Sequence, residues 1–127
     1  MGSYFVTSYV IKDDNIILLG LSITSVSPPL NISINIIREL ADEFRKDFEK
    51  GIAIFSNTEA DDKVQLIVAV SDGLTKQGYH AGNIARSIAN KIGGSGGGRP
   101  QMAQAGGKDI EKLKQVFDNI NEFIKKN

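Results

Sequence analysis

The chain has 127 residues, 41% of them hydrophobic and 24% charged, with a formal net charge of zero, which is typical of one soluble globular domain. It has no cysteine and one histidine, His80, which excludes disulfides and a thiolate nucleophile and argues against a protein zinc site. We recognise no signal-peptide pattern, and no stretch approaches the roughly 20 apolar residues of a membrane helix, so we expect a cytoplasmic or organelle-matrix protein.

Residues 4–11 and 16–26 are rich in β-branched and aromatic side chains and predict two strands joined by a polar turn at 12–15. The second strand has few polar residues, so we expect it to be buried on both faces. The first three residues are typical of an expression-tag remnant. We therefore expect an N-terminal hairpin that ends at the proline pair 28–29, because proline removes a backbone donor.

A helix is predicted next, from a cap at Asn31 or Ser33 to about Lys50. Its apolar residues recur at helical spacing and form one stripe. They are Ile34, Ile37, Leu40, Ala41, Phe44 and Phe48. The carboxylates of this helix have cations three or four residues away, which predicts a solvated face with ion pairs rather than an acid–base dyad. These cations are Arg38, Arg45 and Lys46.

A second hairpin is expected from strands at 52–56 and 64–70, joined by an acidic turn at 57–62. A polar loop at 71–78 leads to the second helix, which has the cleanest helical period in the chain. Its apolar residues are Ala81, Ile84, Ala85, Ile88, Ala89 and Ile92.

Seven of the 13 glycines lie between Gly93 and Gly107, and residues 102–105 within this run predict a short extended piece. Asp109 is expected to cap a last helix. The apolar stripe of that helix is Ile110, Leu113, Val116, Phe117, Ile120, Phe123 and Ile124. Together the elements predict an α+β domain of two layers, with three helices packed on one mixed β-sheet.

No acidic residue lies between Asp72 and Asp109, and this window holds five of the 15 basic residues. The five are Lys76, Arg86, Lys91, Arg99 and Lys108. The rest of the chain has 10 basic and 15 acidic residues, so a cationic segment is set in an acidic body. A locally positive face attracts polyanions even in a neutral protein, which indicates nucleic-acid binding; chance segregation of charge is the alternative.

The glycine run indicates binding rather than catalysis. It lacks the Gly-Lys-Ser/Thr ending of a P-loop and follows a helix rather than a strand, which argues against a mononucleotide site of that type. Its N–H groups could form an anion-binding nest, with Arg99 in bidentate contact with phosphate and Gln101, Gln104 and Lys108 close by. The alternative is that the glycines only permit close packing of helix on sheet.

A second candidate site lies at the start of the second helix, from Gly78 to Asn83. Free N–H groups at a helix start favour an anion, and Tyr79 and His80 offer surfaces on which unpaired bases can stack. A helix cap or a packed side chain is the alternative for His80, and a solvated side chain is the alternative for Lys76.

From Gly96 to Asp109 the sequence reads GGGRPQMAQAGGKD, which closely resembles the C-terminal signature of alanyl-tRNA synthetases. The stretches 80–83 and 40–42 match the same pattern, and the resemblance runs from about residue 15 to the C-terminus. It implies a C-Ala-type nucleic-acid-binding domain at 15–127, preceded at 1–14 by an N-terminal strand and linker remnant. DHH phosphoesterases have a related domain with a similar Gly-Gly-Gly-His-Pro stretch.

The resemblance implies a non-catalytic module that holds the elbow of alanine tRNA. The aminoacylation and editing domains of the same chain would then act on the 3′ end. It implies no cofactor and no metal in this fragment, and ATP, Mg and Zn in other domains of the parent enzyme. The residues that match family positions are Gly96, Gly97, Gly98, Arg99 and Gln104. Those added from charge and location are Lys76, His80, Asn83 and Lys108.

The sequence departs from this pattern in places. Ser95 interrupts a glycine stretch that is often unbroken, and Gln101 replaces the usual aspartate, which removes a negative charge beside Arg99. Residues 1–14 do not resemble the helical linker associated with dimerisation, so a homodimer stays open. The alternative functions are an accessory domain of a DHH phosphoesterase and a dimerisation or interaction module. DNA stays open as a partner, because phosphate contacts are not base-specific.

Overall fold

The computed structural model describes residues 2–13, 15–26, 34–60 and 63–124. Six strands form one sheet in the order β2-β1-β3-β4-β6-β5, and every pairing between these strands is antiparallel. The strands are β1 (Gly2–Lys12), β2 (Asn15–Val26), β3 (Gly51–Ala60), β4 (Lys63–Val70), β5 (Ser95–Gly98) and β6 (Met102–Gly107). The helices are α1 (Ile34–Asp47), α2 (Asp72–Thr75), α3 (Ala81–Lys91) and α4 (Ile110–Asp118), with a 3₁₀ turn at Ile120–Glu122. The expected α+β class is confirmed, although the sheet is antiparallel where a mixed sheet was expected.

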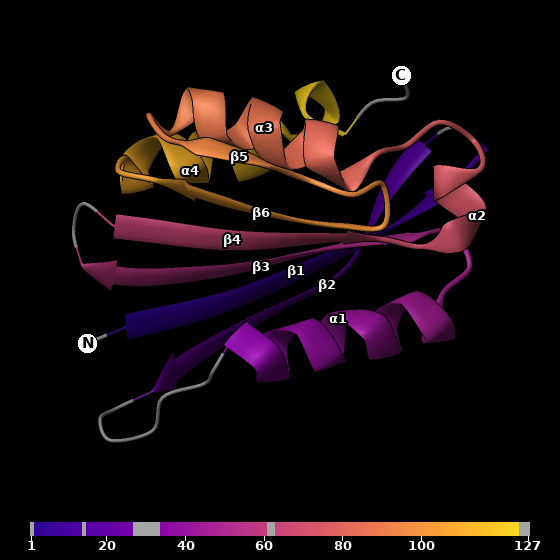
Figure 1. The fold of residues 1–127 in the computed structure, drawn as a ribbon, viewed down its shortest axis with the longest axis horizontal. Helices are drawn as coiled ribbons and strands as arrows, with labels where there is room; N and C mark the ends of the chain where they lie inside the picture. Colours follow the sequence, from indigo (N-terminus) through magenta and orange to yellow (C-terminus); the bar gives the residue numbers. More distant parts are fainter. Residues whose placement is uncertain (1, 14, 27–33, 61–62, 125–127) are drawn as a thin grey trace.

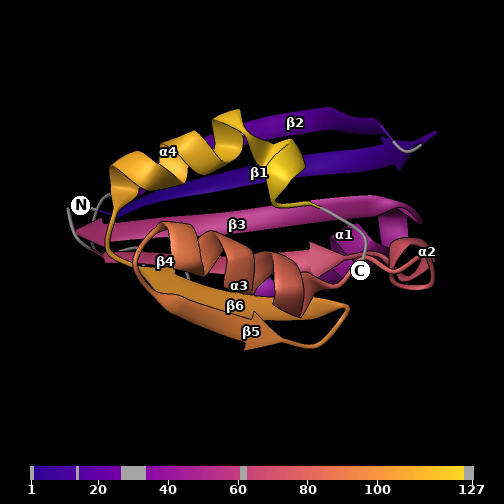
Figure 2. The ribbon, with the colours of Figure 1, turned by 90° about the horizontal axis from the view of Figure 1, so that it is seen from above.

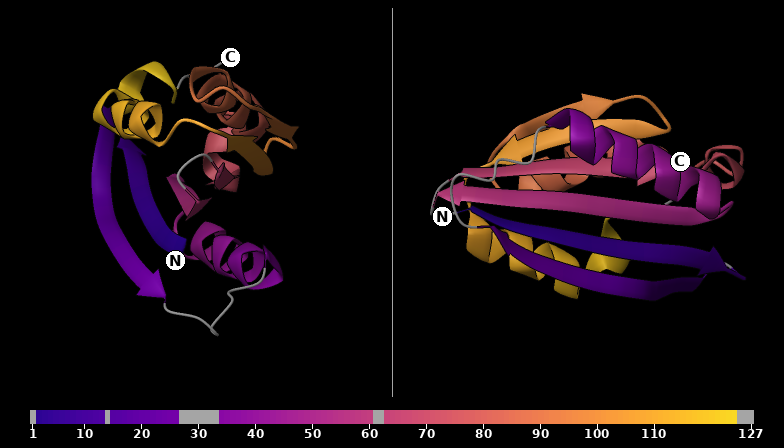
Figure 3. Two further views of the ribbon diagram at one scale, coloured as in Figure 1. Left: turned by 90° about the vertical axis from the view of Figure 1, so that its left-hand side faces the viewer. Right: turned by 90° about the horizontal axis from the view of Figure 1, so that it is seen from below.

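Helices cover both faces of the sheet, with α3 and α4 on one face and α1 on the other (Figures 1 and 3). Two crossovers, β2–α1–β3 and β4–α3–β5, each join parallel strands that have one other strand between them. Both crossovers move toward the β5 edge of the sheet. Their first strands, β2 and β4, run antiparallel to each other. The common right-handed crossover then places α1 and α3 on opposite faces. The molecule therefore has a layer beyond the two expected.

The larger core lies between the sheet and the helices α3 and α4. Every apolar residue predicted for the face of α3 is at most 1% exposed, which confirms that prediction. The Asp109 carboxylate caps α4, because it accepts a hydrogen bond from the Lys112 N–H at 3.0 Å. Leu113, Val116 and Ile124 are buried, and the rest of the predicted stripe packs partly buried against the same core. In the part of the chain that the structure describes, no helix is long and apolar enough to cross a membrane.

A smaller core lies beneath α1, where Ala41 packs with residues of β3 and β4. Leu40 was expected in the buried stripe, but it is 51% exposed, because α1 meets the sheet through Ile37, Ala41 and Phe44. The helix ends at Asp47 rather than near Lys50. The chain turns tightly here, and a Cβ at Gly51 would lie 2.8 Å from the Phe44 ring.

The strands differ from the prediction at positions whose structure depends on pairing between distant segments of the chain. β2 is an edge strand, so Ile17 and Leu18 are 43% and 58% exposed rather than buried. β3 continues to Ala60 and pairs with the start of β4, so residues 57–60 are strand rather than turn. The expected loop at 71–78 contains α2. Residues 27–33 and 61–62, with the proline break, the Asn31 or Ser33 cap and the end of the acidic turn, lie outside the described residues.

β1 is an internal strand between β2 and β3. The sheet therefore includes residues on both sides of the boundary expected at residue 15, and the N-terminal segment contributes its own buried side chains, Thr7, Tyr9 and Ile11. The hairpin expected from β1 and β2 is confirmed, with Lys12 paired to Asn15 at its end.

Tyr9 makes the stability of the fold sensitive to alkaline pH. Its side chain is 4% exposed, and burial raises the pKa of its hydroxyl to about 12. Unfolded tyrosine ionises near pH 10, so between about pH 10 and 12 the unfolded state loses a proton that the folded state keeps. Because Tyr9 also lines an open hollow and solvent screens its hydroxyl, we expect the free energy of unfolding to fall by roughly 1 kcal/mol across this window. Urea titrations at several alkaline pH values measure the fall, and Tyr9→Phe should lose this part of it; an unchanged fall in that variant contradicts the assignment.

Candidate nucleic-acid interface

The glycine run folds into a β-hairpin at the edge of the sheet (Figure 2). β5 pairs with β6 from Ser95 opposite Gly106 to Gly98 opposite Ala103, and the expected extended piece at 102–105 is part of β6. The turn at 99–101 is closed by the Arg99 N–H, which donates to the Met102 carbonyl at 2.9 Å. The run thus presents a strand edge, whereas an anion-binding nest needs a turn-like backbone.

Close packing explains several of the glycines. A Cβ at Gly96 or Gly98 would lie 2.6 or 2.7 Å from the paired alanine of β6. A Cβ at Gly82 on α3 would lie 2.5 Å from the Gly98 carbonyl oxygen, so α3 and β5 approach each other backbone to backbone. Gly97 differs, because the nearest atom to a Cβ there is Nη2 of Arg86, at 3.5 Å. The packing explanation therefore accounts for Gly96 and Gly98 but leaves Gly97 accessible.

The turn of the hairpin occupies the start of α3. Two N–H groups of the helix, at 81 and 82, donate to the carbonyl oxygens of Pro100 and Arg99 at 2.8 and 3.2 Å. The next N–H, of Asn83, donates to Nδ1 of His80 at 3.2 Å, so His80 is the helix cap. These N–H groups therefore fix the hairpin to the helix instead of offering an anion site.

A groove of about 520 Å³ lies between α1 and the hairpin. α1 contributes Arg38, Asp42 and Arg45. The hairpin contributes Gly97, Gly98, Arg99, Gln101, Met102, Ala103 and Gln104. The structure thus brings the predicted residues Arg99 and Gln104 together with two arginines that the sequence had placed on a solvated helix face.

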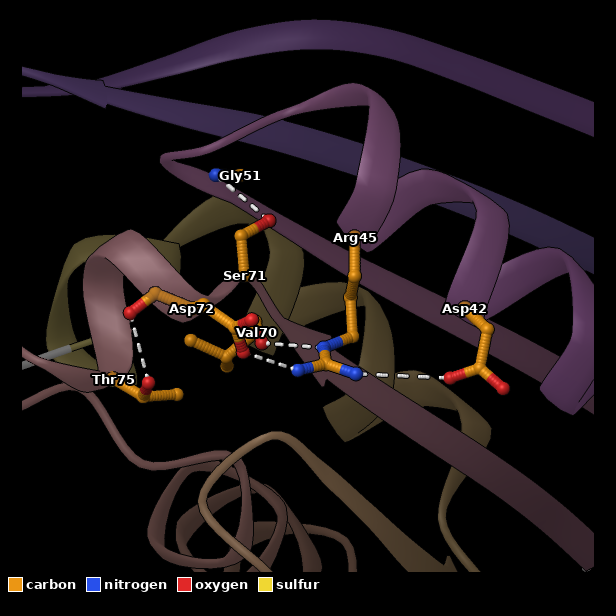
Figure 4. A network of polar contacts seen from close by, with 7 residues as sticks. All are labelled: Asp42, Arg45, Gly51, Val70, Ser71, Asp72 and Thr75. Atoms are coloured by element: carbon orange, nitrogen blue, oxygen red, sulfur yellow. Dashed lines mark hydrogen bonds and ion pairs between the residues drawn. The ribbon is translucent and has the colours of Figure 1, made fainter.

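Arg45 holds α1 against the end of β4 (Figure 4). Its Nε donates to the Val70 carbonyl at 2.9 Å, and its Nη2 lies 2.5 Å from a carboxylate oxygen of Asp72. Its Nη1 lies 3.7 Å from Asp42, and its side chain is only 19% exposed. Two carboxylates therefore neutralise much of the charge of Arg45, and this residue mainly connects α1 to the end of β4.

Arg38 reaches across the groove to Gln104. Because Arg38 has only donors, the Gln104 amide is assigned with its oxygen toward Arg38, where it accepts from Nε at 3.1 Å and also from Nη2. Within the described residues neither Arg38 nor Arg99 forms an ion pair, although the carboxylate of Asp42 lines the same groove. Both side chains are exposed at the groove.

Arg86 flanks β5 from the opposite face. Its Nη1 donates to Oδ1 of Asn83 at 3.3 Å, and its Nη2 lies beside Gly97. The remaining predicted cations lie elsewhere: Lys76 follows α2, and Lys108 follows β6, and neither lines the groove. The edge strand is therefore flanked by arginines that come from helices on both faces of the sheet.

Residues 13–126 match the family model of the DHHA1 domain. The alanine–tRNA ligase of Geobacillus thermodenitrificans is 42% identical over 91 residues, which are 72% of this chain and 10% of the ligase. That of Ligilactobacillus salivarius is 36% identical over 104 residues, 81% of this chain and 12% of the ligase. The chain thus spans about a tenth of the length of these curated relatives.

A solved structure, the C-Ala domain from Aquifex aeolicus alanyl-tRNA synthetase, has a similar fold, with a TM-score of 0.63 and 26% identity. The match covers 73% of this chain and 82% of that domain. It agrees with the family model, which extends over nearly the whole chain. The chain belongs to the DHHA1 domain family.

Proposed function

We propose that this chain is the C-terminal tRNA-binding module of an alanine–tRNA ligase. In this proposal it holds the elbow of the L-shaped tRNA while the catalytic and editing domains act on the 3′ end. The observation that carries the proposal is the gathering of Arg38, Arg86 and Arg99, from three separate elements, around the edge strand β5. The similar proteins named above, which are alanine–tRNA ligases and a C-Ala domain, support tRNA as the polyanion.

The chemistry of this surface suits a folded RNA backbone. Three of the four residues of β5 are glycines, so the strand presents backbone and lets a partner approach closely. Guanidinium groups on both sides can bind phosphate oxygens in bidentate geometry. Phosphate contacts carry no sequence information, so recognition depends mainly on RNA shape, as the elbow proposal requires.

The direct test is a titration of labelled alanine tRNA with this domain at low and moderate salt, beside a tRNA whose elbow loops have been altered. We expect affinity to fall steeply with salt, because bound phosphates release counterions. We also expect the altered tRNA to bind more weakly at each salt concentration. Absence of binding at low salt, or equal affinity for the two RNAs, contradicts the proposal.

Removing either flanking arginine should weaken this binding. We expect Arg99→Ala and Arg86→Ala each to lower tRNA affinity by roughly tenfold, because each loses a charged hydrogen bond to phosphate. The slope of log affinity against log salt should become shallower by about one. Lys114→Ala on α4 is the matched control, because it removes one exposed cation far from β5. An equal loss in the control would show that total charge, and not this surface, governs binding.

A further inference from the structure

The contact with Arg38 occupies the oxygen of the Gln104 side-chain amide. A glutamine amide has an acceptor oxygen and a nitrogen with two donors. The oxygen of Gln104 is used by Arg38, which donates to it from Nε at 3.1 Å and from Nη2. Arg38 has donors only, so the reverse amide orientation would set donor against donor. The amide nitrogen of Gln104 must therefore point away from Arg38.

That nitrogen remains accessible. Gln104 is exposed and lies opposite Gly97 in the strand register, so β5 has no side chain that covers it. In this orientation the hydrogen bonds of the amide are those that its oxygen accepts from Arg38. The groove that it lines, of about 520 Å³, is in the range of roughly 300–1,000 Å³ that holds small ligands, and Met102 adds an apolar wall. The space and chemistry suit one nucleotide whose base lies in the groove.

We infer that Gln104 donates a hydrogen bond to an acceptor atom on a nucleobase of the bound RNA, and that Arg38 is the positioning residue that sets its amide for this contact. The inference rests on the proposed function and adds to it a contact that is not to phosphate. A free glutamine can pair with adenine through both ends of its amide. Because the oxygen of Gln104 is taken, this two-ended pairing is closed, and the amide nitrogen can only donate to an acceptor atom on the base.

Gln104→Met tests the donor directly, because it keeps the length of the side chain, adds no charge and removes the amide. We expect affinity for labelled alanine tRNA to fall about threefold to tenfold, the cost of one hydrogen bond. The salt slope should stay unchanged, because no phosphate contact is lost. Gln65→Met is the matched control, since Gln65 is exposed on the neighbouring strand β4 and lines the adjoining hollow. Its affinity should match the unaltered domain, and circular dichroism should show that both variants fold.

Arg38→Lys separates positioning from simple charge. Lysine keeps the positive charge but cannot hold the amide oxygen with a two-donor fork. We expect the affinity of Arg38→Lys to fall about as far as that of Gln104→Met, with the salt slope unchanged. The double variant should show little further loss, because both changes remove the same contact. If Arg38→Lys binds as tightly as the unaltered domain, Arg38 acts as a phosphate-binding charge and the positioning role is overturned.

The outcomes distinguish this inference from the proposed function. If the unaltered domain does not bind the tRNA at low salt, both fail. If it binds with a steep salt dependence and Gln104→Met binds equally well, the proposed function stands and the nucleobase contact is overturned.

Discussion

Replacing Gly94 with alanine is expected to lower the free energy of unfolding by about 3 kcal/mol. A Cβ at this position would run into the carbonyl oxygen of Gly106, which belongs to the backbone of β6. That backbone is fixed by the adjacent pairing of Ser95 with Gly106, so it cannot move without opening the hairpin. Gly94 is also held from the other side, because its N–H donates to the Ala89 carbonyl at 2.9 Å and closes the end of α3.

The neighbouring glycine is a sharp control for this prediction. Gly93 has a φ of +73° but no atom within 4 Å of a Cβ, so Gly93→Ala costs only its unfavourable backbone conformation, about 1 kcal/mol. Urea unfolding followed by circular dichroism compares the two variants. Equal losses would mean that the overlap of the Gly94→Ala Cβ with β6 is relieved at little cost, because Gly94, unlike Gly93, has no positive φ. Gly94→Ala should also weaken tRNA binding, because it displaces β5.

Replacing Ile88 with alanine is expected to lower the free energy of unfolding by about 2–5 kcal/mol. Ile88 is fully buried in the middle of α3, where it packs in the larger core, and the truncation leaves a cavity. Ser87→Ala changes the adjacent, exposed residue and should shift stability by less than about 0.5 kcal/mol. A loss in Ile88→Ala as small as in this control would mean that the core closes around the missing atoms.

The same variant separates stability from binding. Ile88 lies away from the turn that α3 holds through residues 81 and 82, so the arginines around β5 should keep their positions while the domain is folded. We therefore expect unchanged tRNA affinity in Ile88→Ala well below its unfolding temperature. A large loss of affinity in the folded variant would contradict this separation.

Local patterns predicted the three longer helices and the hairpins β1–β2 and β3–β4, because the information for them lies within a few residues, but they missed α2 and β5. The helical period of α3 gave both its position and its buried face, and Asp109 gave the start of α4. The number of layers depended on strand order and crossover handedness, which are set by pairing between segments that lie far apart in the chain. The exposure of Leu18 likewise follows from the edge position of β2, and composition cannot reveal which strand is at an edge.

The candidate site was predictable only in the part that is local in sequence. The glycine run pointed to Arg99 and Gln104, both of which line the groove. Arg38 was missed, because a helix face that meets solvent and one that lines a groove have the same pattern of charges. One signal for Arg38 was present: the match to the synthetase pattern at 40–42 lies in the same helix. The roles of Lys76 and Lys108 stay predictions, since neither residue lines the groove.

The two free edges of the sheet carry different risks of strand addition from another molecule. β5 has four residues and is flanked by Arg86 and Arg99, and short edges beside charges resist intermolecular pairing. β2 has 12 residues, with Ile17 and Leu18 exposed, and resembles an open template. In concentrated samples we therefore expect self-association to begin along β2, at the opposite end of the sheet, so that even an associated domain keeps its arginine-flanked edge open to RNA.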